Sequence, residues 1–206
     1  RAGKSGGADK TFWLDEDFGP LKPRNIYGIT KLSAESLCRL YSKLHGMDVA
    51  ILRTSRFFPE DDDTLTHPSG LNLKANEFLN RRLTVEDAAD SHICALANIT
   101  GLGCETFIVS APPPFDPSEG AELMHDAQAV IARKFPQAVD LYNECGWVLP
   151  DIIERVYDPS KMERLLDFRC KTDFAAILSA LAAGEQLPFQ HDPSYISPKE
   201  KSGAIC

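Results

Sequence analysis

The chain has 206 residues, of which 43% are hydrophobic and 25% charged, the balance of an ordinary globular protein. Its formal net charge of −8 does not favour a nucleic-acid-binding surface. No apolar run approaches the roughly 20 residues that a membrane helix requires, and the polar start RAGKSGGADK lacks the apolar segment of a secretion signal. We therefore expect a cytoplasmic protein that binds neither nucleic acid nor membranes.

The six cysteines and five histidines show no metal-type spacing, so no metal site is expected and the thiols are predicted to be reduced. The first residue is Arg rather than Met, which suggests either processing or a longer polypeptide. Residues 1–25 are predicted to be a loop without a strand.

The first predicted helix runs from Tyr27 to about His45 and has apolar residues at steps of three and four, which predicts one buried face. Gly46 is a natural helix stop. The run MDVAILRTS, residues 47–55, predicts a strand buried on both faces. The acidic run Glu60–Asp63 in the following loop is expected to be solvated.

Further along, residues 71–83 are ambiguous between a short helix and a strand. Thr84 is predicted to cap a helix that follows it, and residues 105–111 to form a second buried strand. A helix is predicted over 118–135, stopped by Pro136.

Asp158 and Pro159 are predicted to start the next helix, and Thr172 to cap the last one. The tail after Leu187 is expected to be loosely held. Strands that alternate with helices predict an α/β protein with few parallel strands flanked by helices. Two or three convincing strands are too few for a complete doubly wound domain, so we expect the C-terminal part of one.

The pattern Tyr-x-x-x-Lys occurs three times, at Tyr27/Lys31, Tyr157/Lys161 and Tyr195/Lys199. Prolines interrupt the second and third, so only Tyr27 and Lys31 have an uninterrupted helical path and share one face. An ammonium group beside a phenol favours the phenolate, so such a pair can move a proton to or from a substrate hydroxyl. The alternative is an ordinary half-buried Tyr with an extended Lys beside it.

Three blocks of sequence set this pair in context: LDEDFGPLKPRNIYGITKLSAE, HGMDVAILRTSRFFPE and NRRLTVEDAADSHICALAN. Their order resembles the extended short-chain dehydrogenase/reductase superfamily, specifically its NAD-dependent epimerase/dehydratase family. The resemblance covers residues 12–183 and implies a Rossmann-like fold with a smaller substrate lobe. It divides the chain into 1–58, 59–190 and a flexible tail, 191–206.

The resemblance also implies roles. Tyr27 would be the catalytic acid/base, and Lys31 would lower its pKa and bind the nicotinamide ribose of NAD or NADP. Thr54, Ser55, Arg56 and Phe57 would lie near that cofactor. Arg82 and Asp87 would lie at the substrate side, facing a sugar nucleotide or a small hydroxyl or carbonyl compound.

The chain departs from the family in one large respect, the absence of a glycine-rich dinucleotide loop before Tyr27. The stretch GKSGG at residues 3–7 lacks the spacing of a phosphate loop, and Ser5 follows no apolar strand, so it is given no catalytic role. We therefore expect dinucleotide binding by these 206 residues to be weak or lost.

Two other functions stay open. One is a non-redox binding or assembly module whose exposed apolar faces favour a homodimer or a partner. The other is cofactor-independent hydrolysis with Tyr27 and Lys31 as the base. Four arginines are candidates for binding an anion or for forming ion pairs with Glu60, Asp87 or Asp90: Arg53, Arg56, Arg81 and Arg82.

Overall fold

The computed structural model describes residues 9–196 and confirms the α/β class. Its strands are β1 (Phe12–Leu14), β2 (Val49–Thr54), β3 (Cys104–Val109) and β4 (Arg155–Tyr157). Its helices are α1 (Ile26–His45), α2 (Gly70–Glu77), α3 (Val85–Asn98), α4 (Gly120–Leu123), α5 (Ala127–Lys134), α6 (Pro136–Cys145), α7 (Ser160–Leu166) and α8 (Phe174–Ala183), with short 3-10 turns η1 (Asp61–Thr64) and η2 (Pro117–Glu119). In this part of the chain we find no helix with the length and hydropathy to cross a membrane.

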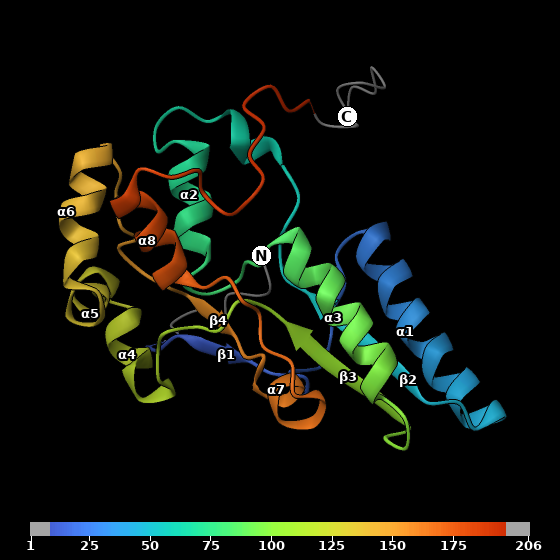
Figure 1. Cartoon of the computed structure of the whole chain (residues 1–206). Helices are drawn as coiled ribbons and strands as arrows, with labels where there is room; N and C mark the ends of the chain where they lie inside the picture. The colour runs from blue at the N-terminus through green and yellow to red at the C-terminus, as the bar shows by residue number, and fades with distance from the viewer. Residues whose placement is uncertain (1–8, 197–206) are drawn as a thin grey trace.

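The strands form two parallel pairs rather than one continuous sheet (Figure 1). β2 pairs with β3 from Val49 opposite Cys104 to Thr54 opposite Val109, and α1, α3 and α7 contact this pair. β1 pairs with β4. The prediction of a strandless loop over residues 1–25 is therefore wrong, because Phe12–Leu14 adds to a partner strand that lies about 140 residues away and has only three residues of its own.

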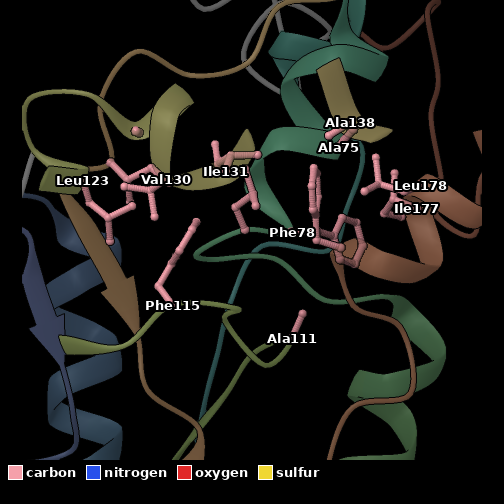
Figure 2. Packing of buried hydrophobic residues seen from close by; sticks show 14 of the residues in the cluster. Ala75, Phe78, Ala111, Phe115, Leu123, Val130, Ile131, Ala138, Ile177 and Leu178 are labelled. Carbon is pink, nitrogen blue, oxygen red and sulfur yellow. The ribbon is translucent and has the colours of Figure 1, made fainter. Parts of the chain in front are cut away.

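One hydrophobic core joins α2, α5, α6 and α8, away from α1 (Figure 1). Phe78, Leu123, Val130, Ile131 and Ile177 are all fully buried there, and Figure 2 shows their side chains converging. A second core lies against β3, where Phe107 and Val109 pack with residues of α3 and α7. Burial of large apolar side chains of this kind is what holds the short elements in place.

Several predicted helix limits are correct. α1 ends at His45 with Gly46 in the left-handed conformation, and the Thr84 side chain accepts a hydrogen bond from the Asp87 amide at the start of α3. The predicted helix over 118–135 is wrong, since it divides into α4 and α5. Pro136 does not end the helical region but occupies the first turn of α6, where its missing N–H costs nothing.

Two predicted caps are also wrong. Asp173, rather than Thr172, caps α8 by accepting from the Ala176 amide. α7 begins at Ser160, one residue after the predicted Pro159.

α1 differs most from its prediction, because none of its residues is buried. An apolar stripe runs along its outer side and is roughly half exposed or more: Ile26, Ile29, Leu37, Leu40, Tyr41 and Leu44. The side of α1 that faces β2 and β3 is polar instead, as Arg39 donates to the Thr106 hydroxyl at 2.8 Å. The predicted two-sided burial of β2 is likewise wrong, since Ile51 is its one buried residue.

Within the described part of the segment after Leu187, residues 189–192 are anchored rather than loosely held. The Phe189 ring stacks on Phe78 at 5.6 Å, and Lys74 Nζ donates to the Gln190 carbonyl at 2.8 Å. Asp63, expected to be solvated, is buried and forms an ion pair with Lys74. Residues 1–8, which include Ser5 and GKSGG, and residues 197–206 lie outside the described part, and the predicted domain limits stay predictions.

Candidate functional site

Tyr27 and Lys31 lie in the first turns of α1. Asn25 caps this helix by accepting a hydrogen bond from the Gly28 amide at 2.8 Å, so the helix begins immediately before Tyr27. The two side chains share a face, with Lys31 Nζ 5.4 Å from the centre of the Tyr27 ring. Tyr27 is 69% exposed, so its hydroxyl is accessible to a ligand.

An ion pair between α1 and β2 fixes the position of the helix along the direction of the strand. Arg53 of β2 donates to both carboxylate oxygens of Glu35, each at 2.9 Å, and these hydrogen bonds hold the pKa of Glu35 below its usual value. Tyr27 lies two helical turns before Glu35 and Lys31 one turn before it. At 1.5 Å per residue, these positions are about 12 Å and 6 Å from Glu35 along the helix.

β2 runs back along α1 toward the start of the helix. α1 and β2 are consecutive and in contact through a three-residue connection, so they run antiparallel. At about 3.3 Å per residue, Ser55 lies roughly 7 Å beyond Arg53, at the height of Lys31. The start of α1 and the carboxyl end of β2 therefore lie toward the same end of the β2–β3 pair, the end at which open parallel sheets bind their ligands.

Two serines at this edge have buried hydroxyls without a partner. Ser55 follows β2 and Ser110 follows β3, and the Ser55 amide donates to the Val109 carbonyl at 2.9 Å. Both serines are at most 5% exposed, and within residues 9–196 neither Oγ has a hydrogen-bond partner. Such groups are costly unless a ligand or water satisfies them, which makes this edge a candidate binding site.

Of the remaining predicted cofactor residues, Thr54 is exposed and Phe57 is half-buried beside Phe58. Arg56 is committed to the protein, since it forms ion pairs with Glu77 at 2.5 Å and Asp62 at 3.0 Å, and another with Glu60. Its guanidinium thus belongs to an ionic cluster that also contains Glu60, Asp62 and Glu77.

Arg82, predicted at the substrate side, is 1% exposed and belongs to the same cluster. It donates to Glu77 at 2.7 Å and to the Phe58 carbonyl at 3.1 Å. Burial lowers its pKa, and Glu77 opposes that shift. For all four arginines the ion-pair alternative holds in this structure, although Glu35 and Glu77 are the main partners rather than Asp87 or Asp90.

Asp87 is 2% exposed, and its carboxylate is fully engaged by the protein. It accepts hydrogen bonds from the Thr84 hydroxyl at 3.0 Å and from the amides of Lys171 at 2.8 Å and Thr172 at 3.2 Å. These bonds tie the loop before α8 to the start of α3. The geometry gives Asp87 a structural task, while its role toward substrate stays a prediction.

A cavity of about 450 Å³ lies beside the ionic cluster, between α2 and the segment that leads into β4. Its lining includes Asn76, Asn80, Arg81 and Arg155. The Asn76 Oδ1 and Arg81 Nε atoms are buried and have no partner among the described residues. Arg81 and Arg155 bring positive charge to the cavity, but Asp62, Glu77, Asp151 and Glu154 also line it. The amide nitrogens of Asn76 and Asn80 donate to the carbonyls of Val148 and Arg155.

Four residues of these sites were not found from the sequence: Ser110, Asn76, Asn80 and Arg155. Ser110 lies inside the predicted strand 105–111, whereas β3 ends at Val109, so its place after the strand gave no signal. Asn76 lies in the stretch that was ambiguous between helix and strand. Arg155 belongs to β4, a strand of three residues that is too short for a periodic signal.

Tyr27, Lys31 and Ser55 carry hydroxyl and ammonium groups of the kind that bind the nicotinamide and ribose end of a dinucleotide. A cradle for the pyrophosphate needs a glycine-rich turn between a strand and a helix N-terminus. Residues 9–196 contain no such turn: β1 leads to α1 through Asp15–Asn25, whose one glycine is Gly19.

The sequence comparison identifies a family for part of the chain. The model of the NAD dependent epimerase/dehydratase family matches residues 5–79, which confirms the resemblance over that segment. The matched segment contains Tyr27, Lys31 and Ser55. A search of curated proteins found no match.

Solved structures of low sequence identity are also similar. UDP-N-acetylglucosamine 4-epimerase from Bacillus cereus is 23% identical, with 82% of this chain and 55% of that chain covered and a TM-score of 0.49. UDP-glucuronic acid 4-epimerase from Bacillus cereus in complex with NAD is 16% identical, with 88% and 59% covered and a TM-score of 0.47. A short-chain dehydrogenase/reductase superfamily protein from Agrobacterium tumefaciens with bound NAD is 17% identical, with 84% and 60% covered and a TM-score of 0.49. The chain thus spans less than two thirds of the length of each.

Proposed function

We propose that this chain carries the proton-transfer and substrate side of an NAD(P)-dependent epimerase/dehydratase-like oxidoreductase. The observation that carries the proposal is the shared face of Tyr27 and Lys31 at the start of α1, with Lys31 Nζ 5.4 Å from the centre of the Tyr27 ring. The antiparallel run of α1 and β2 puts this face, by the rise per residue, at about the height of Ser55. The family match over residues 5–79 supports it.

Each residue then has a defined task. Tyr27 Oη takes the proton from a substrate hydroxyl as that carbon becomes a carbonyl, and returns it in the reverse step. Lys31, one turn further along α1, stabilises the phenolate and binds ribose hydroxyls. A nicotinamide cofactor bound at this edge would take up and give back the hydride. Ser55 donates a hydrogen bond to the carbonyl or hydroxyl oxygen that faces it.

A sugar nucleotide is the substrate class that we favour. The cavity beside the ionic cluster is lined by both Arg81 and Arg155. One end of the Arg81 guanidinium pairs with Glu77, and its buried Nε atom, which has no partner among the described residues, would donate to a phosphate oxygen. Asp62 and Glu77 also line this cavity. Both form ion pairs with Arg56, the residue that follows Ser55 in the chain.

The test compares Tyr27→Phe with Tyr41→Phe, which removes an exposed hydroxyl from the same helix. Each protein is incubated with NAD and a panel of UDP- and dTDP-sugars, and the sugar products are followed by NMR. We expect the Tyr27 variant to lose activity by about 10²-fold or more, as for loss of a general acid/base, and the Tyr41 variant to keep it. Equal activity of the two variants would contradict the proposed role.

A second candidate rests on a different observation, the outward apolar stripe of α1. The stripe follows steps of three and four over nearly the whole 20-residue helix, as in a helix that packs on another helix. In this case the chain is a binding or assembly module, and a second copy covers α1. Absence of turnover in every substrate arm, together with a dimer that depends on the stripe, would favour this candidate.

A further inference from the structure

A second, larger cavity of about 1070 Å³ lies apart from the residues predicted to hold the cofactor. Its walls are the first turns of α3, the loop at Lys171–Thr172, the end of α8 and residues 185–192, which we call the strap. Neither Tyr27, Lys31 nor the segment 54–57 lines it. Asp87 lies in its wall, but its carboxylate is taken up by hydrogen bonds within the protein. Ligand binding in this cavity can therefore be tested without any change to Tyr27, Lys31 or the segment 54–57.

The strap is a fixed wall of this cavity. Lys74 Nζ donates to the Gln190 carbonyl at 2.8 Å, and the Asp192 amide donates to Asp63 Oδ2 at 2.7 Å. Lys74 and Asp63 are themselves buried and paired. A wall held in this way forms the cavity before any ligand arrives, which lowers the entropic cost of binding.

Apolar and aromatic side chains form much of the lining. Trp147 and Phe189 contribute rings, and Leu181 and Leu187 contribute aliphatic groups. The Trp147 ring is held edge-on against Tyr142 at 5.4 Å. Such a lining suits the apolar body of a small organic ligand, and the face of a Trp or Phe ring also attracts a cation.

The charges around the cavity favour a cation. α8 ends here at Ala183 without a basic residue in its last turn, and Glu185 follows after the capping residue Gly184. Glu86 and Glu185 are exposed and, within residues 9–196, have no ion-pair partner. Lys171 offers little opposition, because its ammonium pairs with Asp90 at 2.6 Å.

His191 lies in the wall beside the buried Lys74–Asp63 pair. Its Nδ1 atom is buried and lies 3.4 Å from Asp63 Oδ2, so this nitrogen is directed at that carboxylate and adds no acceptor for a ligand. Burial lowers the pKa of His191, which favours the neutral ring and so adds no positive charge to the wall.

We propose that the strap cavity binds an organic ammonium ion with an apolar, preferably aromatic, body. The ammonium group lies between Glu185, Glu86 and the end of α8, and the body lies against Trp147 and Phe189. No residue of the proposed catalytic face takes part.

The probe is 2-phenylethylamine, with 2-phenylethanol as its neutral counterpart and 3-phenylpropionate as its anionic one. Binding to the full chain is measured by calorimetry and by the indole N–H signal of Trp147, assigned with Trp13→Phe. For a ligand of this size we expect a Kd of about 1 mM or tighter. The alcohol should bind about fivefold more weakly or worse, and the acid should not bind measurably.

Two glutamate variants test whether the carboxylate of Glu185 binds the ammonium group. Glu185→Gln should weaken amine binding by about two- to fivefold, the contribution of one exposed ion pair. The matched control is Glu144→Gln, an exposed glutamate of α6 that does not line the cavity, and it should change nothing. Equal affinity for amine and alcohol, no shift of the Trp147 signal up to about 10 mM amine, or equal effects of the two variants would overturn the proposal.

Discussion

Replacement of Asp87 by Ala should destabilise the protein strongly. The carboxylate is 2% exposed and accepts hydrogen bonds from Thr84 Oγ1 and from the amides of Lys171 and Thr172. Alanine leaves these donors without a partner inside the protein. Hydrogen bonds to a charged group contribute about 1.5–3 kcal/mol each, so loss of the two amide bonds should lower the free energy of unfolding by about 3–6 kcal/mol.

The assay is urea unfolding followed by far-UV circular dichroism, with Asp90→Ala as the control. Asp90 lies on the same helix, but its one ion pair, to Lys171 Nζ, is solvent-exposed, so its loss should cost less than about 1 kcal/mol. A free energy for Asp87→Ala within about 1 kcal/mol of the control would refute the structural role and favour the substrate role that the family resemblance implies for Asp87.

Other predictions concern α1, the core and the cofactor. The lowered pKa of Glu35 means that its pair with Arg53 stabilises the fold above the unfolded pKa, near 4.5, and that this contribution is lost as pH falls through the folded pKa. Urea titrations at several pH values should show the gap between wild type and Glu35→Gln closing below about pH 4.5. If the stripe of α1 is an interface, Leu37→Glu with Leu40→Glu should convert a dimer to a monomer by light scattering, and a wild-type monomer would contradict this. Phe78→Ala should cost about 3–5 kcal/mol in urea unfolding, because it empties a fully buried site. Calorimetry should give NAD and NADP dissociation constants of about 1 mM or weaker, and micromolar binding would contradict the missing pyrophosphate cradle.

Local signals in the sequence predict the parts of the fold that depend on neighbouring residues. Gly46 ends α1 and Thr84 begins α3 as predicted, since a left-handed stop and a side-chain cap act within one turn. β1 and β4 were missed because each has three residues and exists only through pairing across the chain. Their stability comes from tertiary contacts, which no local pattern records.

Periodicity also predicts that α1 has an apolar face but not what that face contacts. The stripe from Ile29 to Leu44 was predicted to be a buried face, and it is exposed instead, as the binding-module alternative expects. The reason lies in Glu35 and Arg39, whose partners Arg53 and Thr106 hold the polar side of the helix against the strands. The candidate site shows the same division. Tyr27 and Lys31 were singled out by an uninterrupted helix and by the family resemblance, whereas Ser110 required the sheet register.

The central claim is that the start of α1 and the carboxyl end of β2 form one nicotinamide-binding face. The most direct measurement is NMR shift mapping of the chain with nicotinamide mononucleotide, which needs no cradle for the adenosine half of a dinucleotide. We predict shifts at Tyr27, Lys31 and Ser55 that weaken in Lys31→Met and persist in Lys43→Met on the same helix. Shifts confined to other parts of the molecule, or equal behaviour of the two lysine variants, would contradict it.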